Sequence, residues 1–176
     1  MSEETRLAPG FLDRFWSAFF GSDADEPELP RRSTLYWRNV KVLPRTADEL
    51  EAAVDRWHRF VHPRARRIFS LEQLDSMLTQ IAHGVNRTED PIAGQQEECS
   101  LWHGDVSLDE NGRLQAAICI VNKDGSQSIG FANRLLTFLF ADDASYDALR
   151  ELPATQDALQ MACGNQLCVN LAHVAM

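Results

Sequence analysis

Met161-Ala-Cys163-Gly-Asn-Gln-Leu-Cys168-Val-Asn-Leu-Ala-His173 is the stretch that organises this chain. It holds two of the four cysteines and one of the five histidines, in the spacing Cys-x4-Cys-x4-His. Thiolates and an imidazole so close together suit a tetrahedral Zn²⁺, which binds sulfur and nitrogen at about 2.0–2.3 Å. Three ligands do not close a structural zinc site, so the pattern predicts a fourth ligand from another part of the chain.

The fourth ligand is predicted to be Cys99, in the segment Cys99-Ser-Leu-Trp102. A ligand so distant in the sequence would close a long loop, and the free energy of metal binding would become free energy of folding. The alternative is that these cysteines are buried thiols and the histidine is satisfied within an ordinary strand and turn. Cys119 lies in the apolar run of residues 114–121 and is interpreted as a core residue rather than a ligand.

Length and composition indicate one domain with its own core, since 44% of the 176 residues are apolar. Four cysteines without a secretory leader do not suggest a disulfide framework, so an intracellular location, nucleus or cytoplasm, is expected. No apolar run approaches the roughly 20 residues of a membrane span. The acidic N-terminus resembles neither a signal peptide nor a transit peptide. No motif for a small-molecule substrate is evident.

The net charge of −9 is unevenly distributed. Residues 1–30 carry two basic and seven acidic side chains, and residues 31–67 carry ten basic and four acidic ones. Residues 68–176 carry five basic and fifteen acidic side chains. Because an acidic surface repels phosphate, the region of the metal ligands is not expected to bind nucleic acid by itself.

Residues 1–30 are predicted to form an aromatic helix followed by an acidic linker. Apolar side chains repeat at helical spacing over residues 11–20, and residues 22–30 are acidic and contain two prolines. A tethered aromatic helix could dock in a groove of a protein partner. The side chains expected to contact that partner are Phe11, Phe15, Trp16 and Phe19. The alternative is that this helix folds back onto its own domain.

Two capping boxes predict helices in residues 31–98, a mainly helical segment. The box that begins at Thr46 predicts a helix over residues 47–62, and the box that begins at Ser70 predicts one over residues 71–84. Pro63 and Gly84 supply the stops. Residues 85–98 have no period and are interpreted as a loop.

Basic side chains gather in residues 31–67, which also include a predicted strand over residues 34–43. These side chains could contact phosphates, with Trp37 or Trp57 available to stack on bases. The predicted nucleic-acid contacts are Arg38, Lys41, Arg45, Arg64, Arg66 and Arg67. The alternative is a solvated surface that balances the acidic remainder of the chain.

Residues 99–176 are predicted to combine a hairpin, two helices and the metal loop. The expected strands cover residues 99–106, 114–121 and 128–131. Glycines at positions 112 and 125 supply the turns between them. Helices are expected over residues 132–141 and 144–152. The chain as a whole is therefore predicted to be α+β, with a helical N-terminal half followed by a zinc-stapled hairpin and helix.

The order of these features resembles the zinc-binding loop region of His-Me finger (His-Cys box) homing endonucleases. The resemblance covers residues 99–174 and rests on a Cys-x-Leu-Trp-x-Gly strand, an Asn-Gly hairpin, an Asn-Arg-Leu helix and a Cys-Val-Asn-x-x-His ending. A similar ending occurs in the Smad DNA-binding domain. The resemblance implies one structural zinc per chain, with Asn170 as a turn residue that bonds its local backbone. The implied ligands are Cys99, Cys163, Cys168 and His173.

The chain departs from the catalytic residues of that family. The family's general base is a histidine two residues before the first loop cysteine, where this chain has Met161, and a thioether does not accept a proton at neutral pH. The family's magnesium-binding asparagine lies on a helix after the zinc loop, and this helix is expected to be absent because three residues follow His173. His103 would lie near the zinc rather than at the catalytic position.

These patterns together predict a degenerate, catalytically inactive zinc protein with three parts, residues 1–30, 31–98 and 99–176. Its expected function is nucleic-acid binding through the basic residues of the second part. The alternative is protein–protein interaction or a scaffold role through the aromatic helix and the acidic surface. An active endonuclease is the least favoured of the three interpretations.

Overall fold

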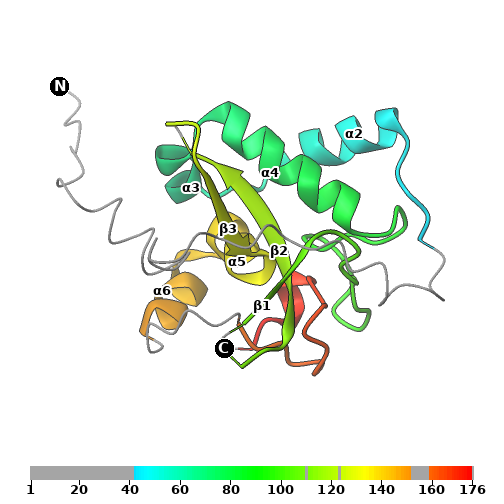
Figure 1. The fold of residues 1–176 in the computed structure, drawn as a ribbon, viewed down its shortest axis with the longest axis vertical. Helices are drawn as coiled ribbons and strands as arrows, with labels where there is room; N and C mark the ends of the chain where they lie inside the picture. The colour runs from blue at the N-terminus through cyan, green and yellow to red at the C-terminus, as the bar shows by residue number, and fades with distance from the viewer. Residues whose placement is uncertain (1–41, 110, 123, 152–158, 176) are drawn as a thin grey trace.

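The computed structural model describes residues 42–109, 111–122, 124–151 and 159–175 (Figure 1). The helix and linker expected within residues 1–30, and all but the last two residues of the strand expected over residues 34–43, lie outside this part of the chain. The described residues form helices and one three-stranded antiparallel sheet, so the predicted α+β class is confirmed. None of the described helices is long and apolar enough to cross a membrane.

Two helices begin where their capping signals predict. α2 (Ala47–His58) follows Thr46, and α4 (Leu71–Gly84) follows Ser70. In each case the capping side chain accepts a bond from the backbone of the third helical residue, whose own side chain bonds back to the cap. Both predicted starts are confirmed. They could be predicted because every bond of a capping box is made between neighbouring residues.

The predicted end of the first helix near His62 is wrong. The helix stops at His58, and a short helix, α3 (Pro63–Ile68), follows after a turn. Pro63 stands at the start of α3, where its missing N–H costs nothing and its fixed φ suits the helix. The His62 ring accepts a hydrogen bond from the backbone N–H of Arg64 at 3.3 Å, so this histidine caps α3.

The sheet has the strand order β1-β2-β3. Its strands are β1 (Val106–Leu108), β2 (Leu114–Val121) and β3 (Gln127–Phe131). Gly112 and Gly125 adopt φ values of 74° and 85° in the two connecting turns, as the Asn-Gly and Asp-Gly signals predict. The pairing sets Val106 opposite Ala116 and Ala117 opposite Phe131.

The strand predicted over residues 99–106 is wrong for most of its length. β1 begins only at Val106, whereas the backbone before it pairs with the C-terminal loop. Leu101 forms an isolated bridge with Cys168, and the N–H of Trp102 donates to the carbonyl of Leu167 at 2.8 Å. Residues 100–102 therefore pair with the metal loop instead of with β2, and pairing with β2 begins at Asp105, whose carbonyl accepts from the N–H of Ala117.

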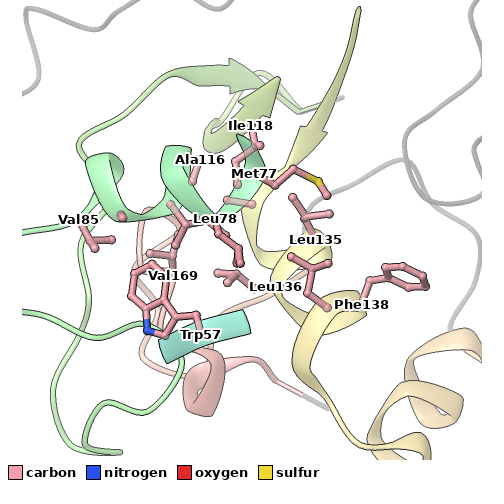
Figure 2. Close-up of a cluster of buried hydrophobic side chains, with 14 of the residues drawn as sticks. Trp57, Met77, Leu78, Val85, Ala116, Ile118, Leu135, Leu136, Phe138 and Val169 are labelled. Carbon is pink, nitrogen blue, oxygen red and sulfur yellow. The ribbon is translucent and has the colours of Figure 1, made fainter. Parts of the chain in front are cut away.

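One face of the sheet is covered by helices and carries the core. α5 (Ala132–Phe140) and α6 (Asp143–Glu151) lie close to their predicted bounds, and α4 and α5 pack on β2. Figure 2 shows side chains from α2, α4, α5 and β2 converging in this core. Val169 joins them from the C-terminal loop and is 1% exposed. The loop is thus part of the core and not an appendage.

Two glutamines of α4 cover the edge of β2 that extends beyond β1. The Gln80 amide both donates to the carbonyl of Cys119, at 2.7 Å, and accepts from its N–H, at 3.0 Å. Gln73 donates to the carbonyl of Val121 at 2.8 Å. These side chains replace a neighbouring strand at an edge that would otherwise be open to pairing.

Candidate metal centre

Four predicted ligands from two distant parts of the chain meet in one cluster. The cluster consists of Cys99, Cys163, Cys168 and His173, whose ligand atoms all lie within 4.8 Å of one another. Cys99 comes from the segment before β1, and the other three come from the C-terminal loop. In Figure 1 that loop, coloured orange to red, lies at the end of the sheet near β1.

Cys99 is positioned by the buried Trp102, three residues further along the chain. Trp102 is 1% exposed and donates its indole N–H to the carbonyl of Asp105 at 2.6 Å. A Cβ added to Gly84, the last residue of α4, would lie 2.3 Å from the Trp102 ring. The ring thus packs directly on the glycine backbone. The backbone of Ser100 and Trp102 also pairs with Val169 and Leu167, which holds Cys99 beside the loop.

The loop itself is shaped by local turns. Gly164 has a φ of 74° and donates its N–H to the carbonyl of Met161 at 2.8 Å, so the chain reverses directly after Cys163. Asn165 begins a second turn, in which it accepts bonds from the N–H groups of Leu167 and Cys168. Two consecutive turns therefore bring Cys163 and Cys168 to the same side of the loop.

Asn170 fastens the loop to the segment before Cys99. Its side-chain oxygen accepts from the N–H of Ala172 at 3.0 Å, which confirms the local turn role that the resemblance implies. Its amide nitrogen also donates to the carbonyls of Gln95 and Glu98 at 3.0 and 2.7 Å. This second role was not predicted, because backbone acceptors in a loop leave no signal in the sequence.

His173 presents one defined nitrogen to the sulfurs. It ends the 3₁₀ turn η1 (Leu171–His173), and its Nε2 lies 2.5 Å from the carbonyl oxygen of Gln96. A carbonyl only accepts, so Nε2 carries the proton and Nδ1 keeps its lone pair. Nδ1 lies 3.4 Å from the Cys168 sulfur and 3.7 Å from the Cys99 sulfur. Such a backbone contact on the far nitrogen is the usual way to orient a metal-binding histidine.

Two sulfur–nitrogen distances in the cluster fit a zinc ion. With Zn–S of about 2.3 Å and Zn–N of about 2.0 Å, a tetrahedron has S···N edges of roughly 3.5 Å and S···S edges of roughly 3.8 Å. The two S···N distances of 3.4 and 3.7 Å lie on either side of that edge. The donor set of three thiols and one imidazole is one that structural zinc sites use.

The three thiols differ in burial and in ease of ionisation. Cys168 is fully buried, Cys99 is half-buried and Cys163 is exposed. Burial raises the pKa of Cys168 to about 12 and also raises the pKa of Cys99. Partial burial opposes ionisation of Cys163, but hydrogen bonds from the Asn165 backbone and from the neighbouring ligands hold its pKa below the ordinary value. A bound cation would favour all three thiolates.

Two other candidate residues lie outside the cluster. Cys119 is on β2, half-buried rather than fully in the core, and burial raises its pKa. It is not among the clustered ligands of the described chain. His103 donates its backbone N–H to the carbonyl of Gly84 at 2.6 Å and is also not in the cluster.

Met161 is a buried packing residue. It is 4% exposed, forms an isolated bridge with Val174, and receives the amide of Asn133 at 3.8 Å from its sulfur. The same amide donates to the carbonyl of Leu159 at 2.7 Å. The position that the resemblance assigns to a general base is thus occupied by an apolar side chain within the fold.

Three of the predicted nucleic-acid contacts donate their guanidinium groups to backbone carbonyls of the protein, although Arg66 itself is exposed. Arg45 donates to the carbonyls of residues 82, 85 and 89. Arg64 donates to the carbonyls of residues 138 and 141, and Arg66 to those of residues 61 and 58. Arg67 is exposed. Arg38 and Lys41, like the partner contacts Phe11, Phe15, Trp16 and Phe19, lie outside the described residues.

The fold and the cluster define an α+β protein with a candidate metal centre of three cysteines and one histidine. No protein-family model, no curated protein and no solved structure matches the chain. The likeness to His-Me finger endonucleases therefore rests on the motif residues alone.

Proposed function

We propose that Cys99, Cys163, Cys168 and His173 bind one structural Zn²⁺. The observation that carries this proposal is the placement of the His173 Nδ1 atom 3.4 and 3.7 Å from two thiol sulfurs while Nε2 is held by a carbonyl. Four protein ligands leave no open coordination position for water or substrate. The metal would therefore stabilise the fold and take no part in a reaction.

The zinc would join residues that are 74 positions apart in the sequence, from Cys99 to His173. Because the backbone of the loop also pairs with residues 100–102, binding energy at the metal becomes stability of the whole C-terminal half. The test of this proposal is to measure the zinc content and the melting temperature of the wild type and of Cys168→Ser. The wild type should hold about one zinc per chain, and the variant should lose both zinc and cooperative unfolding.

Cys119→Ser is the matched control, because it removes a thiol that lies outside the cluster. It should keep the zinc content of the wild type. A well-folded wild type that contains no zinc would overturn the proposal.

We further propose that the protein binds a protein partner through residues 1–30 and its acidic surface, and that it is not a nuclease. The inward hydrogen bonds of Arg45 and Arg64 support this, because guanidinium groups that hold the fold together are not free to contact phosphate. The buried thioether of Met161 supports the absence of hydrolysis. Deletion of residues 1–30 should abolish capture of the partner without lowering the melting temperature. Loss of folding on deletion would show instead that this segment belongs to the core.

Nucleic-acid binding is a second candidate, favoured by one surface. Phe60 is 53% exposed, and the exposed arginines nearby in the sequence are Arg59 in the same turn and Arg67 on α3. Arg66 bonds to the carbonyls of His58 and Val61, which brings α3 against this turn. An exposed ring together with exposed cations suits base stacking and phosphate contact. Affinity for single-stranded nucleic acid that falls steeply with salt, and is lost in the double variant Arg59→Ala, Arg67→Ala, would support this candidate. No binding at low salt would exclude it.

A further inference from the structure

The three thiols of the metal centre are not equally accessible to a reagent in water. Cys168 is 0% exposed, and Cys99 is half-buried. Cys163 is exposed, and so are its neighbours Ala162 and Gly164. A small oxidant that arrives from solvent therefore meets the Cys163 sulfur first.

The ligands also differ in how firmly the fold holds them. Cys168 is fixed by its bridge to Leu101 and by the Asn170 N–H, which donates to its sulfur at 3.5 Å. His173 is fixed through Gln96. Cys163, in contrast, lies on an exposed turn whose residues 162–165 make no contribution to the hydrophobic core. It is the ligand that can move with the least disturbance of the core.

We propose that Cys163 is an oxidation site through which a peroxide converts Cys99 and Cys163 into a disulfide and releases the zinc. This inference rests on the proposed structural zinc. The sulfurs of the cluster lie within 4.8 Å of one another, so a modest shift of the exposed turn brings two of them into bonding distance.

The chemistry takes place in two steps. The Cys163 thiolate attacks one oxygen of hydrogen peroxide, so that an S–O bond forms, the O–O bond breaks and hydroxide leaves. The Cys99 thiolate then attacks the sulfenic acid, so that the S–S bond forms and the S–O bond breaks with loss of a second hydroxide. Two protons convert the hydroxides to water. The two sulfurs give up two electrons in total, and the peroxide is reduced to two waters.

Cys99 is the partner because Cys168 is enclosed and hydrogen-bonded. A Cys99–Cys163 disulfide would join the same two segments that the metal joins. In the oxidised chain the disulfide would keep these two segments joined, while Cys168 and His173 would no longer bind zinc. A dithiol reductant would restore both thiols, which makes the change reversible.

The test uses the full-length, zinc-loaded protein and hydrogen peroxide. Zinc release is followed with a chromophoric chelator, and the cysteines are mapped by mass spectrometry after alkylation without reduction. The expected result is zinc release together with a disulfide between Cys99 and Cys163, both reversed by dithiothreitol and added zinc. Cys119→Ser should release zinc at the wild-type rate.

Cys163→His replaces the exposed thiol by an imidazole, which also binds zinc but is not oxidised by this route. It should lose the peroxide-dependent phase of release. Zinc release at the wild-type rate from this variant would overturn the inference. A disulfide in the wild type that involves Cys168 or Cys119 instead of Cys163 would also overturn it, whether or not the variant folds. A wild type that carries zinc and keeps it under peroxide overturns this inference alone, whereas a folded wild type without zinc overturns the proposed function.

Discussion

The Nε2 atom of His173 donates to the carbonyl oxygen of Gln96 at a distance of 2.5 Å. Gln96 belongs to the segment that leads to Cys99, so this bond connects the last ligand of the cluster to the region of the first. Asn170 binds the same segment through the carbonyls of Gln95 and Glu98. The orientation of the metal-binding nitrogen therefore depends on residues 95–98, none of which is a metal ligand.

Asn170→Ala should weaken zinc binding although Asn170 is not a ligand. The side chain is 2% exposed, and its truncation removes the amide that donates to the carbonyls of residues 95 and 98. Loss of such a supporting contact typically costs about 10–100-fold in metal affinity. Competition with a chromophoric chelator measures this affinity. Gln160→Ala, at an exposed position near the start of the same loop, is the control and should bind zinc as the wild type does.

Gly84→Ala should destabilise the protein through a steric clash with Trp102. The added Cβ would lie 2.3 Å from the indole ring, which is itself buried and cannot move freely. Overpacking of this kind costs about 1–3 kcal/mol of unfolding free energy. Urea unfolding in the presence of zinc measures the change. The exposed neighbour His83→Ala should change stability by less than about 0.5 kcal/mol. Equal stabilities of the two variants would contradict the close packing of Gly84 on the ring.

Arg64→Met should separate a structural role of this arginine from a role in phosphate binding. Arg64 donates to the carbonyl of Phe138 at 3.0 Å and to Asp143 at 3.0 Å, and it lies 4.2 Å from the centre of the Tyr146 ring. Removal of the charged donors should lower the unfolding free energy by about 1–3 kcal/mol. Arg67→Met is the control, and it should leave stability nearly unchanged because the side chain is exposed. If Arg64→Met is as stable as the wild type, Arg64 has no structural role, and its guanidinium group would be available to contact phosphate.

The elements that were predicted correctly are those whose signals are local. The capping residues Thr46 and Ser70 and the turn glycines Gly112 and Gly125 act on neighbours within a few residues, so the sequence contains the whole interaction. The spacing of Cys163, Cys168 and His173 is local in the same sense. Because structural zinc sites take four ligands, mostly cysteine and histidine, few residues remain as candidates for the fourth ligand.

The elements that were missed depend on distant backbone groups. The segment of Leu101 has strand composition, but its partner is Cys168 rather than β2, and no side-chain pattern specifies that choice. Arg45 and Arg64 were interpreted as a possible phosphate surface because their charge is visible in the sequence. The carbonyls that they bind lie between 37 and 77 positions away and carry no signal of their own.

Asp109 should make stability depend on acid pH. Its side chain is fully buried in the turn between β1 and β2. Burial by itself would raise the pKa of Asp109, but bonds from the Arg113 and Asn111 backbone and from the Gln115 and Arg113 side chains hold it below its ordinary value of 3.8. The ionised form is thus favoured in the folded state. Its contribution to stability is complete above the unfolded-state pKa and is lost as the pH falls through the lower folded-state pKa.

Asp109→Asn removes this charge but keeps the shape of the side chain. At neutral pH the variant should be less stable than the wild type by about 1–3 kcal/mol, because the amide accepts fewer of the four bonds and its NH₂ group faces donors. The difference should shrink as the pH falls below 3.8, the unfolded-state pKa, and through the lower folded-state pKa, where the folded wild type becomes protonated. Denaturant unfolding of both proteins at matched pH measures this difference, and the metal centre, which is common to both, cancels in the comparison. A difference that stays constant from neutral pH to strongly acidic pH would show that the carboxylate charge contributes nothing to the turn.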